Sequence, residues 1–365
     1  MTYDRAIRRA MDRIATEAAG LFLRHAISET DTVRDALEAL NRLSGEAMTL
    51  FVIEKSGRLA GTLTDGDVRR GLLAGLGLDS DVAQAAHHDF MAARSDDELP
   101  SVMRAAREKG IDLLPVAEDG FVTDIIDLRR TRTKLPIQAV LMAGGRGERL
   151  RPLTLDTPKP LLKVGEKAII DYNVDELEAC GVGRIIVTVN YLADQIVDHF
   201  AGRKGKTRVE CIREPKRLGT MGSLSLAEGI DTRDVLVMNS DLLTNLDFEA
   251  MYLHHIGNGA DLTVAAVPYT VSVPFAIMNI EGDVVKGLRE KPTYNYFANA
   301  GVYMMRTELL RRIPADTYVD APDFISSLIG EGGKVGYFPI EGTWIDIGSP
   351  DDFRYANGLM STPRR

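Results

Sequence analysis

The sequence predicts an α/β protein of two domains, and three observations support this prediction. The chain has 365 residues, more than one ordinary compact core accommodates. Its amino-terminal part contains two copies of a helix–strand–turn–strand pattern, at about 22–80 and 86–132. The remainder alternates short apolar runs with helical patterns, which is typical of parallel strands joined by crossover helices. We therefore expect one domain over 1–134 and a doubly wound domain with a mixed central sheet over 135–365.

Composition and charge exclude several classes of protein. The net charge is −9, whereas a protein that binds nucleic acid presents a basic face to the phosphate backbone. No run approaches the ~20 apolar residues that span a bilayer, and the charged start of the chain has no signal-peptide core. Cys180 and Cys211 are too few to form a disulfide framework. We expect a cytoplasmic protein that binds neither nucleic acid nor a membrane.

In each copy of the amino-terminal repeat, a helix precedes two strands joined by a tight turn. The apolar spacing of Val33, Leu37 and Leu40 predicts the first helix, with Asp31 or Thr32 as its N-cap. MTLFVIE and LLPVAE predict the first strand of each copy, and we expect another helix to start after each second strand. The basic stretch RTRTKLP then ends the domain and forms a linker.

The second domain begins with the apolar run IQAVLMA, which predicts a buried strand. RIIVTV and VLVMN predict two more, because strands of a parallel sheet are covered on both faces and are apolar throughout. After residue 260, LTVAAVPY, FAIMNIEG, VVKGLREKP and FANAGVYMMR predict strands without long helices between them. We expect these last strands to add a lid to the sheet.

A glycine-rich segment follows the first strand of the second domain directly. Gly144, Gly145 and Gly147 allow backbone N–H groups to approach a ligand closely and to form an anion nest. The segment is not a P-loop, because it lacks the closing Gly-Lys-Ser/Thr, and it is not the dinucleotide fingerprint, because Leu150 stands at the third glycine. By themselves, these glycines also fit an ordinary flexible turn.

The glycine-rich segment continues as GGRGERLRPLT and is followed by PKPLLKV, a combination that resembles the signature of the sugar-1-phosphate nucleotidyltransferases. Members of that family join a nucleoside triphosphate to a sugar-1-phosphate and release pyrophosphate. The resemblance covers residues 137–349 and implies a Rossmann-like domain. It also implies that phosphate charge is neutralised by Arg149 and Lys159, and that the nucleotide is contacted by Ala143, Gly144, Gly145 and Gly147.

Further motifs extend the resemblance along the chain. REPKRLGTMGSL implies that Glu214 reads the base and that Gly219 and Thr220 lie beside the nucleoside. NSDLL places Asp241 after the strand VLVMN, at the edge where open α/β sheets bind ligands. In the family this aspartate holds Mg²⁺, and WIDIGSP implies Asp346 as the second metal carboxylate.

Two motifs resemble the family's sugar pocket. REKP implies Glu290 as the acceptor of sugar hydroxyls and Lys291 as the lysine of the sugar phosphate, and NAGVY implies Asn299 and Gly301 beside the sugar. VPFAIM departs from the Tyr-Gly of many relatives, which leaves the identity of the sugar open. Taken singly, Asp241 also fits a helix cap, Lys291 a hairpin and Asp346 an ordinary turn, but the order and spacing of the motifs favour the site.

The choice of base follows from hydrogen-bond donors and acceptors. An ionised Glu214 can only accept, and guanine offers two adjacent donors, which favours GTP. A UTP- or dTTP-dependent enzyme and a non-catalytic nucleotide sensor remain as alternatives. For the transfer itself, Arg149, Lys159, Lys291 and Mg²⁺ would supply the counter-charge that two anionic substrates need.

The amino-terminal repeat, with GTLTDGDVRRGLL in its first copy, resembles a CBS-domain pair. Such pairs often bind adenine nucleotides, which implies Thr64 and Asp67 as contacts of the phosphate and ribose. Asp127 aligns with Asp67, but Asp124 stands where Thr64 does and would repel a phosphate, so the second site is impaired. A structural pair that assembles a homo-oligomer is the alternative.

The combination of the two domains has a resemblance of its own. A CBS pair fused to a transferase resembles the glucosamine-1-phosphate guanylyltransferases of bacterial legionaminic acid synthesis. This resemblance implies glucosamine-1-phosphate as the sugar substrate and, with Glu214, GTP as the nucleotide.

Overall fold

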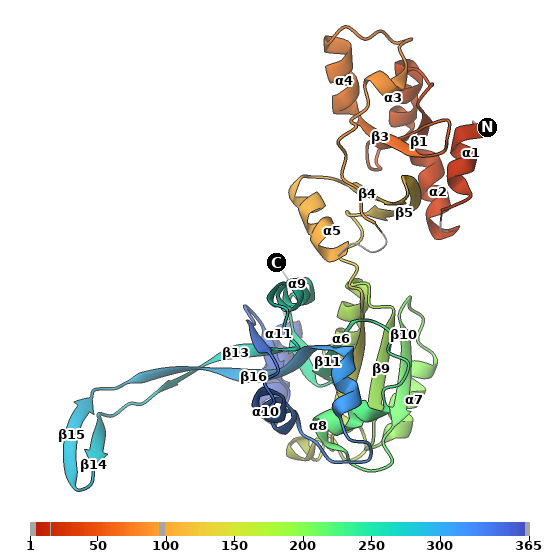
Figure 1. Ribbon diagram of the computed structural model, residues 1–365. Helices are drawn as coiled ribbons and strands as arrows, with labels where there is room; N and C mark the ends of the chain where they lie inside the picture. Colours follow the sequence, from red (N-terminus) through yellow and green to blue (C-terminus); the bar gives the residue numbers. More distant parts are fainter. Residues whose placement is uncertain (1–4, 15, 95–98, 362–365) are drawn as a thin grey trace. The chain divides into compact units, whose positions relative to one another are not determined.

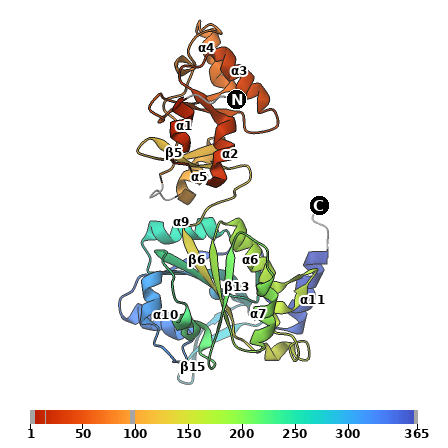
Figure 2. The same ribbon diagram turned by 90° about the vertical axis from the view of Figure 1, so that its right-hand side faces the viewer.

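The computed structural model describes residues 5–14, 16–94 and 99–361 (Figure 1, Figure 2). The chain divides into two compact units, Met1–Lys134 and Leu135–Arg365, and each has its own apolar clusters. Within the described ranges, none of the helices combines the length and the apolar character that crossing a membrane requires.

The first unit starts with two helices, which precede the first copy of the repeat. Its elements are α1 (Arg5–Met11), α2 (Thr16–His25), β1 (Ala26–Ser28), α3 (Val33–Arg42), β2 (Thr49–Ile53), β3 (Leu59–Thr64), α4 (Asp65–Leu73) and the 3₁₀ turn η1 (Val82–Gln84). The strands form a sheet in the order β1-β2-β3, and α3 and α4 pack on it around Leu40, Leu50 and Val68. Thr32 is the N-cap of α3, as predicted, and forms a capping box with Asp35.

The second copy of the repeat keeps only part of the predicted pattern. α5 (Leu99–Glu108) precedes the antiparallel strands β4 (Leu113–Glu118) and β5 (Phe121–Asp127). The expected helix after β5 is absent, because the chain turns there and then runs without regular secondary structure up to Pro136. The Asp127 carboxylate accepts a hydrogen bond from Arg129 Nε at 3.1 Å within this turn. The prediction of a second closing helix was therefore wrong.

A seven-stranded mixed sheet forms the centre of the second unit. Its strands, in spatial order, are β10 (Arg208–Arg213), β9 (Arg184–Val189), β6 (Ile137–Ala143), β11 (Asp234–Asn239), β16 (Thr293–Arg306), β13 (Leu262–Ser272) and β17 (Val335–Pro339). β10, β9, β6 and β11 run parallel, whereas β16 is antiparallel to both β11 and β13. The prediction of a mixed central sheet is confirmed.

Helices cover both faces of this sheet (Figure 2). On one face lie α6 (Ile169–Ala179), α7 (Ala193–Ala201) and α9 (Phe248–Asn258); on the other lie α8 (Gly219–Gly222), η4 (Ser223–Leu226), η5 (Thr307–Arg312) and α10 (Ala321–Gly330). Val140 and Leu141 of β6 are both fully buried but belong to opposite faces. This double coverage explains why the strand is apolar throughout.

A smaller apolar cluster joins distant segments beside the sheet. It contains residues from η2 (Glu148–Leu150), β7 (Lys163–Val164), β12 (Leu242–Thr244), β18 (Trp344–Asp346) and α11 (Pro350–Ser361). β12 pairs antiparallel with β18, and β7 pairs with β8 (Lys167–Ala168), which follows η3 (Lys159–Leu161). Because of this cluster, segments about a hundred residues apart in sequence meet at the edge of the sheet.

β13 and β16 continue beyond the sheet as a long two-stranded projection (Figure 1), which we call the arm (residues 268–297). It ends in a hairpin of β14 (Ile277–Glu281) and β15 (Val284–Arg289). The strands predicted after residue 260 are confirmed, but the prediction that they form a lid was wrong. β13 and β16 stay paired with each other as far as Ser272 and Thr293, so the hairpin projects away from the sheet.

Candidate active site

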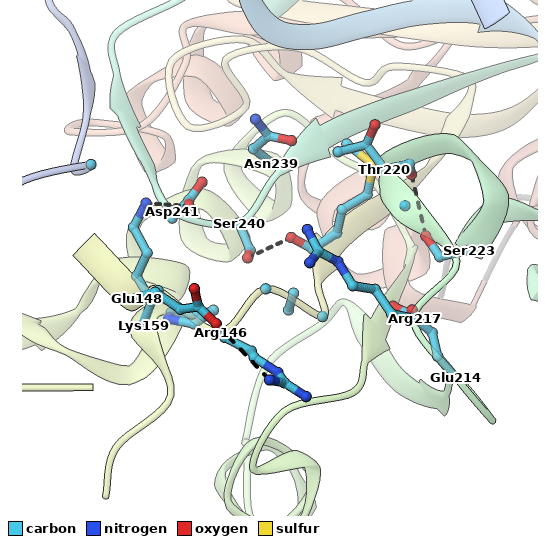
Figure 3. Close-up of a pocket in the computed structure, with 18 of the residues that line it drawn as sticks. Arg146, Glu148, Lys159, Glu214, Arg217, Thr220, Ser223, Asn239, Ser240 and Asp241 are labelled. Atoms are coloured by element: carbon cyan, nitrogen blue, oxygen red, sulfur yellow. Dashed lines mark hydrogen bonds and ion pairs between the residues drawn. The ribbon is translucent and has the colours of Figure 1, made fainter. Parts of the chain in front are cut away.

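A cavity of about 420 Å³ opens at the carboxyl ends of β6 and β11 (Figure 3). The two strands are parallel neighbours, so the segments that follow them meet at one edge of the sheet. Of the residues expected around the nucleotide and metal, the lining contains Ala143, Gly144, Gly145, Gly147, Arg149, Lys159, Glu214, Gly219, Thr220 and Asp241. One enclosure therefore brings together residues from positions 143 to 241 of the chain.

The glycine loop of this cavity is held in a backbone shape that needs glycine at Gly147. Its φ of 59° is in the left-handed region, where a side chain is strained. A Cβ there would also lie 3.0 Å from Thr154 Cγ2 and 3.1 Å from Lys159 Cβ. The Thr154 hydroxyl donates to the Gly147 carbonyl at 2.8 Å, and the Tyr191 hydroxyl donates to the Thr154 carbonyl at 3.0 Å. These contacts fix the loop around the cavity.

Glu214 follows β10 and lies against the glycine loop. A Cβ on Gly144 would overlap Glu214 Oε1, so the absence of a side chain at Gly144 makes room for this carboxyl group. Oε2 accepts a hydrogen bond from Leu218 N–H at 3.3 Å. Burial raises the pKa of the Glu214 carboxyl, and neither this hydrogen bond nor the charge of Arg217 offsets the effect. The cavity thus contains a half-buried acid next to backbone groups of the loop.

Lys159 is buried between two carboxylates. Its Nζ lies 2.5 Å from Asp241 Oδ2 and 3.4 Å from Asp346 Oδ1, and the residue is 7% exposed. Leu242 pairs with Asp346 in the β12–β18 ladder, which brings the two aspartates to the same place. A buried ammonium group needs such partners, because unpaired charge is costly away from water.

Asp241 and Asp346 fit a divalent cation. Their carboxylate oxygens are hard donors, and their side chains remain 24% and 40% exposed toward solvent. Mg²⁺ usually binds to one or two protein carboxylates and completes its shell with phosphate oxygens and waters. No group of three or more His, Cys, Asp or Glu suited to a metal occurs among residues 5–14, 16–94 and 99–361. The two aspartates therefore fit a metal whose other ligands come from the substrates.

Gly219 and Thr220 both line the cavity, and Thr220 lies on the opposite side of it from Lys159 (Figure 3). Gly219 has a φ of 77°, and a Cβ there would lie 2.6 Å from the Val319 carbonyl oxygen. Thr220 N–H donates to Asp320 Oδ1 at 3.2 Å, and the Thr220 hydroxyl accepts from Ala321 N–H at 2.8 Å. The start of α10 thus fixes this side of the cavity.

The four residues expected around the sugar do not come together. Gly301 has a φ of 71° and lies against the side chain of Asn239, which lines the cavity, while Asn299 Oδ1 accepts from Gly301 N–H at 2.9 Å. Glu290 and Lys291 are instead exposed on the arm and are absent from the cavity lining. The expectation that all four surround one cavity within one chain is not met, because the β13–β16 ladder carries the latter two outward.

The cavity also contains residues that no motif singled out. They are Met142, Arg146, Glu148, Leu150, Pro160, Arg217, Ser223, Asn239, Ser240, Asp320 and Gly348. The guanidinium carbon of Arg217 lies 5.9 Å from the ring centroid of Tyr318. Arg217 stands between Glu214 and Gly219 in sequence, so its motif could have indicated it. Asp320 had no such signal, because it reaches the cavity through its contact with Thr220, 100 residues away.

The first unit has a cavity of its own, of about 470 Å³, which Thr64 and Asp67 line and Asp127 does not. Thr64 and Asp67 form the capping box of α4, and Asp67 also pairs with Arg70. Burial acts to raise the pKa of Asp67, but the hydrogen bonds from Thr64 and the Arg70 guanidinium hold it below its usual value. The Arg129 hydrogen bond likewise lowers the pKa of Asp127. Of the two expected motifs, the first therefore faces this cavity and Asp127 of the second does not.

Comparison with known proteins relates both units to families. Residues 138–362 match the family described as Nucleotidyl transferase, and residues 25–74, the first copy of the repeat, match the CBS domain. The mannose-1-phosphate guanyltransferase of Aspergillus oryzae is 32% identical over 237 residues, which cover 62% of this chain and 65% of the relative. The mannose-1-phosphate guanylyltransferase catalytic subunit beta of Danio rerio is 30% identical over 227 residues, which cover 60% and 62%. The match thus spans less than two thirds of these relatives.

A solved structure gives the same assignment. HddC from Yersinia pseudotuberculosis, crystallised in complex with GMP-PN, aligns with a TM-score of 0.50 and 26% identity, over 62% of this chain and 100% of HddC. The match to the family extends over more than half of the chain and includes every segment that lines the cavity at the carboxyl ends of β6 and β11. This chain is therefore a member of the nucleotidyl transferase family that carries a CBS domain in its amino-terminal unit.

Proposed function

We propose that this chain transfers a nucleotidyl group from a nucleoside triphosphate, GTP, to a sugar-1-phosphate, and releases pyrophosphate. The observation that carries the proposal is the cavity that the glycine loop, Glu214, Lys159 and Asp241 line together, with Asp346 in contact with Lys159 beside it. The relatives named as guanylyltransferases and the HddC complex with GMP-PN support the same type of reaction.

The reaction requires charge stabilisation and positioning more than proton transfer. An oxygen of the sugar phosphate attacks the α-phosphorus, and the bond from that phosphorus to the bridging oxygen of the β-phosphate breaks, which releases pyrophosphate. The attacking phosphate is already ionised, so no general base is needed. In this proposal the N–H groups of the glycine loop hold the triphosphate, and Arg149 and Lys159 offset its negative charge.

Asp241 and Asp346 are the residues that would hold a divalent cation, Mg²⁺ in our proposal. When bound, the cation would neutralise charge on the phosphate oxygens of the reaction. Lys159 reduces the repulsion between the two carboxylates, since its ammonium group lies within 3.4 Å of both. Gly301 lies against Asn239, which lines the cavity, and in this proposal Asn299 and Gly301 would contact the sugar.

Glu214 is the residue that we propose reads guanine. An ionised carboxylate accepts from two adjacent donors, as guanine offers, whereas uracil and thymine present a donor between two carbonyl acceptors. Glu214→Gln should therefore weaken the use of GTP and improve UTP or dTTP relative to it, by about tenfold or more, because a mismatched buried polar group costs ~1–3 kcal/mol. An unchanged preference would mean that the backbone reads the base.

The decisive experiment is a panel of the four nucleoside triphosphates, each paired with several sugar-1-phosphates. Mannose-1-phosphate is included because the curated relatives are named for it, and glucosamine-1-phosphate because the two-domain architecture suggests it. Release of pyrophosphate with GTP and one of these sugars is the expected result. Preference for UTP or dTTP would contradict the assignment of Glu214, and no release with any pair would favour a nucleotide sensor.

The cavity of the first unit favours a second function for this chain, the binding of an adenine nucleotide. Asp67→Ala should abolish the heat of binding of AMP, ADP or ATP in calorimetry. Asp35→Ala is the matched control, because Asp35 forms an equivalent capping box on α3 but is not part of the lining of this cavity. Both variants lose the N3 side chain of a capping box and keep its N-cap threonine, so their effects on helix stability are matched. Loss of binding in both, or no heat in the wild type, would leave assembly as the role of this unit.

Cellular location and partners belong to the same proposal. We place the protein in the cytoplasm, because neither Cys180 nor Cys211 is part of a disulfide. We expect no nucleic-acid partner, since the net charge is −9.

A further inference from the structure

The arm exposes far more apolar surface than any other part of the second unit. Of the 22 large apolar side chains exposed in the described ranges, ten belong to the arm, and each is 37–74% exposed. These ten are Tyr269, Val271, Phe275, Met278, Ile280, Val284, Val285, Leu288, Tyr296 and Phe297. None of them belongs to an apolar cluster of the sheet or its helices.

Such an arm is not stable by itself in water. A two-stranded ribbon needs a further strand, a helix or another surface against one of its faces, and both edges of the β14–β15 hairpin are unpaired. The exposed apolar area of the ten side chains is on the order of 1,000 Å², given the usual areas of such residues. A stable interface buries about 800 Å² on each partner. The arm therefore carries enough surface for an interface between two chains.

The geometry of the arm directs this surface away from its own cavity. β13 and β16 are paired without interruption from Ala266 and Asn299 to Ser272 and Thr293, and both are part of the central sheet at their other ends. The paired length beyond the sheet, from Pro268 to Ser272, is about 15 Å at ~3.3 Å per residue. The hairpin at its end projects outward from the second unit (Figure 1). To cover its own cavity, the arm would have to break this ladder.

We propose that two copies of this chain exchange their arms, and that Glu290 and Lys291 of each arm complete the sugar side of the other copy's cavity. The proposal rests on the proposed function, which assigns these two residues to the sugar phosphate. In a two-fold dimer, the arm of each copy covers the cavity of the other copy. One exchange thereby explains the exposed apolar surface and the missing half of the site.

Complementation between two impaired variants tests the exchange directly. Asp241→Asn impairs the cavity, and Lys291→Ala impairs the arm. In a mixed dimer, the cavity of the Lys291→Ala chain receives the intact arm of the Asp241→Asn chain, so one of its two sites is complete. The two full-length chains are co-expressed with different tags, and the mixed dimer is isolated by two successive affinity steps. Pyrophosphate release is then measured with GTP and the sugar-1-phosphate used by the wild type.

The outcomes separate the exchange from the proposed function. Recovery of about half of the wild-type activity in the mixed dimer, with each variant alone at a tenth of the wild-type activity or less, supports exchange. Activity no greater than that of the variants alone, or a monomeric wild-type protein, overturns it. An inactive wild type contradicts the proposed function instead, and an active Lys291→Ala variant contradicts the role of the arm lysine.

A pair of isoleucine variants tests the apolar contact independently. Ile280 on the arm is 58% exposed and Ile329 on α10 is 57% exposed. The two aspartate variants therefore differ in the location of the new charge and not in the exposure of the isoleucine that is replaced. Ile280→Asp should lower kcat/KM for the sugar phosphate at least tenfold while calorimetric binding of GTP is retained, and Ile329→Asp should alter neither. Equal behaviour of the two variants would overturn the proposal that the arm is buried against a second copy.

Discussion

The cavity and the arm carry two halves of one expected site, and they differ in how the fold supports them. Lys159 is 7% exposed and is held by Asp241 and Asp346, whereas Lys291 is exposed on the arm. Residues around the cavity are fixed by segments that are distant in sequence, such as Thr220 with Asp320. The arm is held by the pairing of its own strands and, at its base, by the ring contact of Phe297 with Tyr337 of β17. In our proposal, a single chain therefore completes the nucleotide half of the site but not the sugar half.

The largest effect should come from the centre of the cavity. Asp241→Asn should reduce turnover by about 100-fold or more, because it removes a charge from the cluster that would hold the metal and stabilise the transition state. Asp351→Asn is the control, since Asp351 is an 85% exposed carboxylate on α11 that pairs only with the surface residue Arg354. Steady-state pyrophosphate release gives both rates. Activity of the Asp241→Asn variant close to wild type would remove this residue from the mechanism.

A smaller effect, confined to one substrate, should come from the arm. Lys291→Ala should lower kcat/KM for the sugar-1-phosphate by about 10–100-fold, since a hydrogen bond to a charged group contributes ~1.5–3 kcal/mol. Binding of GTP, measured by calorimetry, should not change. Lys286→Ala tests whether any arm lysine has this effect, because Lys286 is 53% exposed on β15. If GTP binding weakens as well, the division of the site between cavity and arm is wrong.

Within the cavity, Gly144 and Gly145 should respond differently to the same change. A Cβ at Gly144 meets Glu214 Oε1, whereas a Cβ at Gly145 meets no heavy atom within 4 Å. Gly144→Ala should therefore displace the carboxyl group and reduce the preference for GTP over UTP about tenfold, the cost of one poorly made hydrogen bond. Gly145→Ala should keep the wild-type preference. A loss of preference in both variants would show that loop shape, not room for Glu214, selects the base.

The smallest effect is a pH dependence of a few-fold. Burial raises the pKa of Glu214 above 4.5, its ordinary value, so the acid stays protonated to a higher pH than an exposed glutamate. The acceptor form needed for guanine is present above the raised pKa and is lost as pH falls through it. The KM for GTP should therefore rise as pH is lowered from neutral, and Glu214→Gln should abolish that rise. A rise of equal size in the variant would assign the titration to another group.

Local sequence signals predicted most of the second unit. Val140 and Leu141 are buried on opposite faces of the sheet, which is why an unbroken apolar run identified the strand. Gly147 needs a left-handed backbone beside Thr154, which is why a glycine occurs there. Both requirements arise within a few residues of the chain, so the sequence displays them directly.

In the first unit, local sequence signals did not distinguish a binding site from an ordinary capping box. The threonine-to-aspartate spacing that suggested a ligand at Thr64 and Asp67 also forms an ordinary capping box, as it does at Thr32 and Asp35. Only the position of the first pair beside a cavity distinguishes the two. A capping box depends on local backbone geometry alone, whereas a binding site depends on what lies opposite it.

The sequence by itself determined the α/β class, the mixed sheet, the glycine loop and the residues gathered around one cavity, because each depends on local propensity, periodicity or a contiguous motif. Only the tertiary structure decided that Asp320 reaches the cavity through Thr220, that β12 and β18 bring Asp241 to Asp346, and that the arm extends outward instead of closing as a lid. These features depend on pairings between residues about a hundred positions apart or on the direction of a strand ladder in space. Local patterns along the chain do not display these pairings or this direction, because both follow from how completed helices and strands pack.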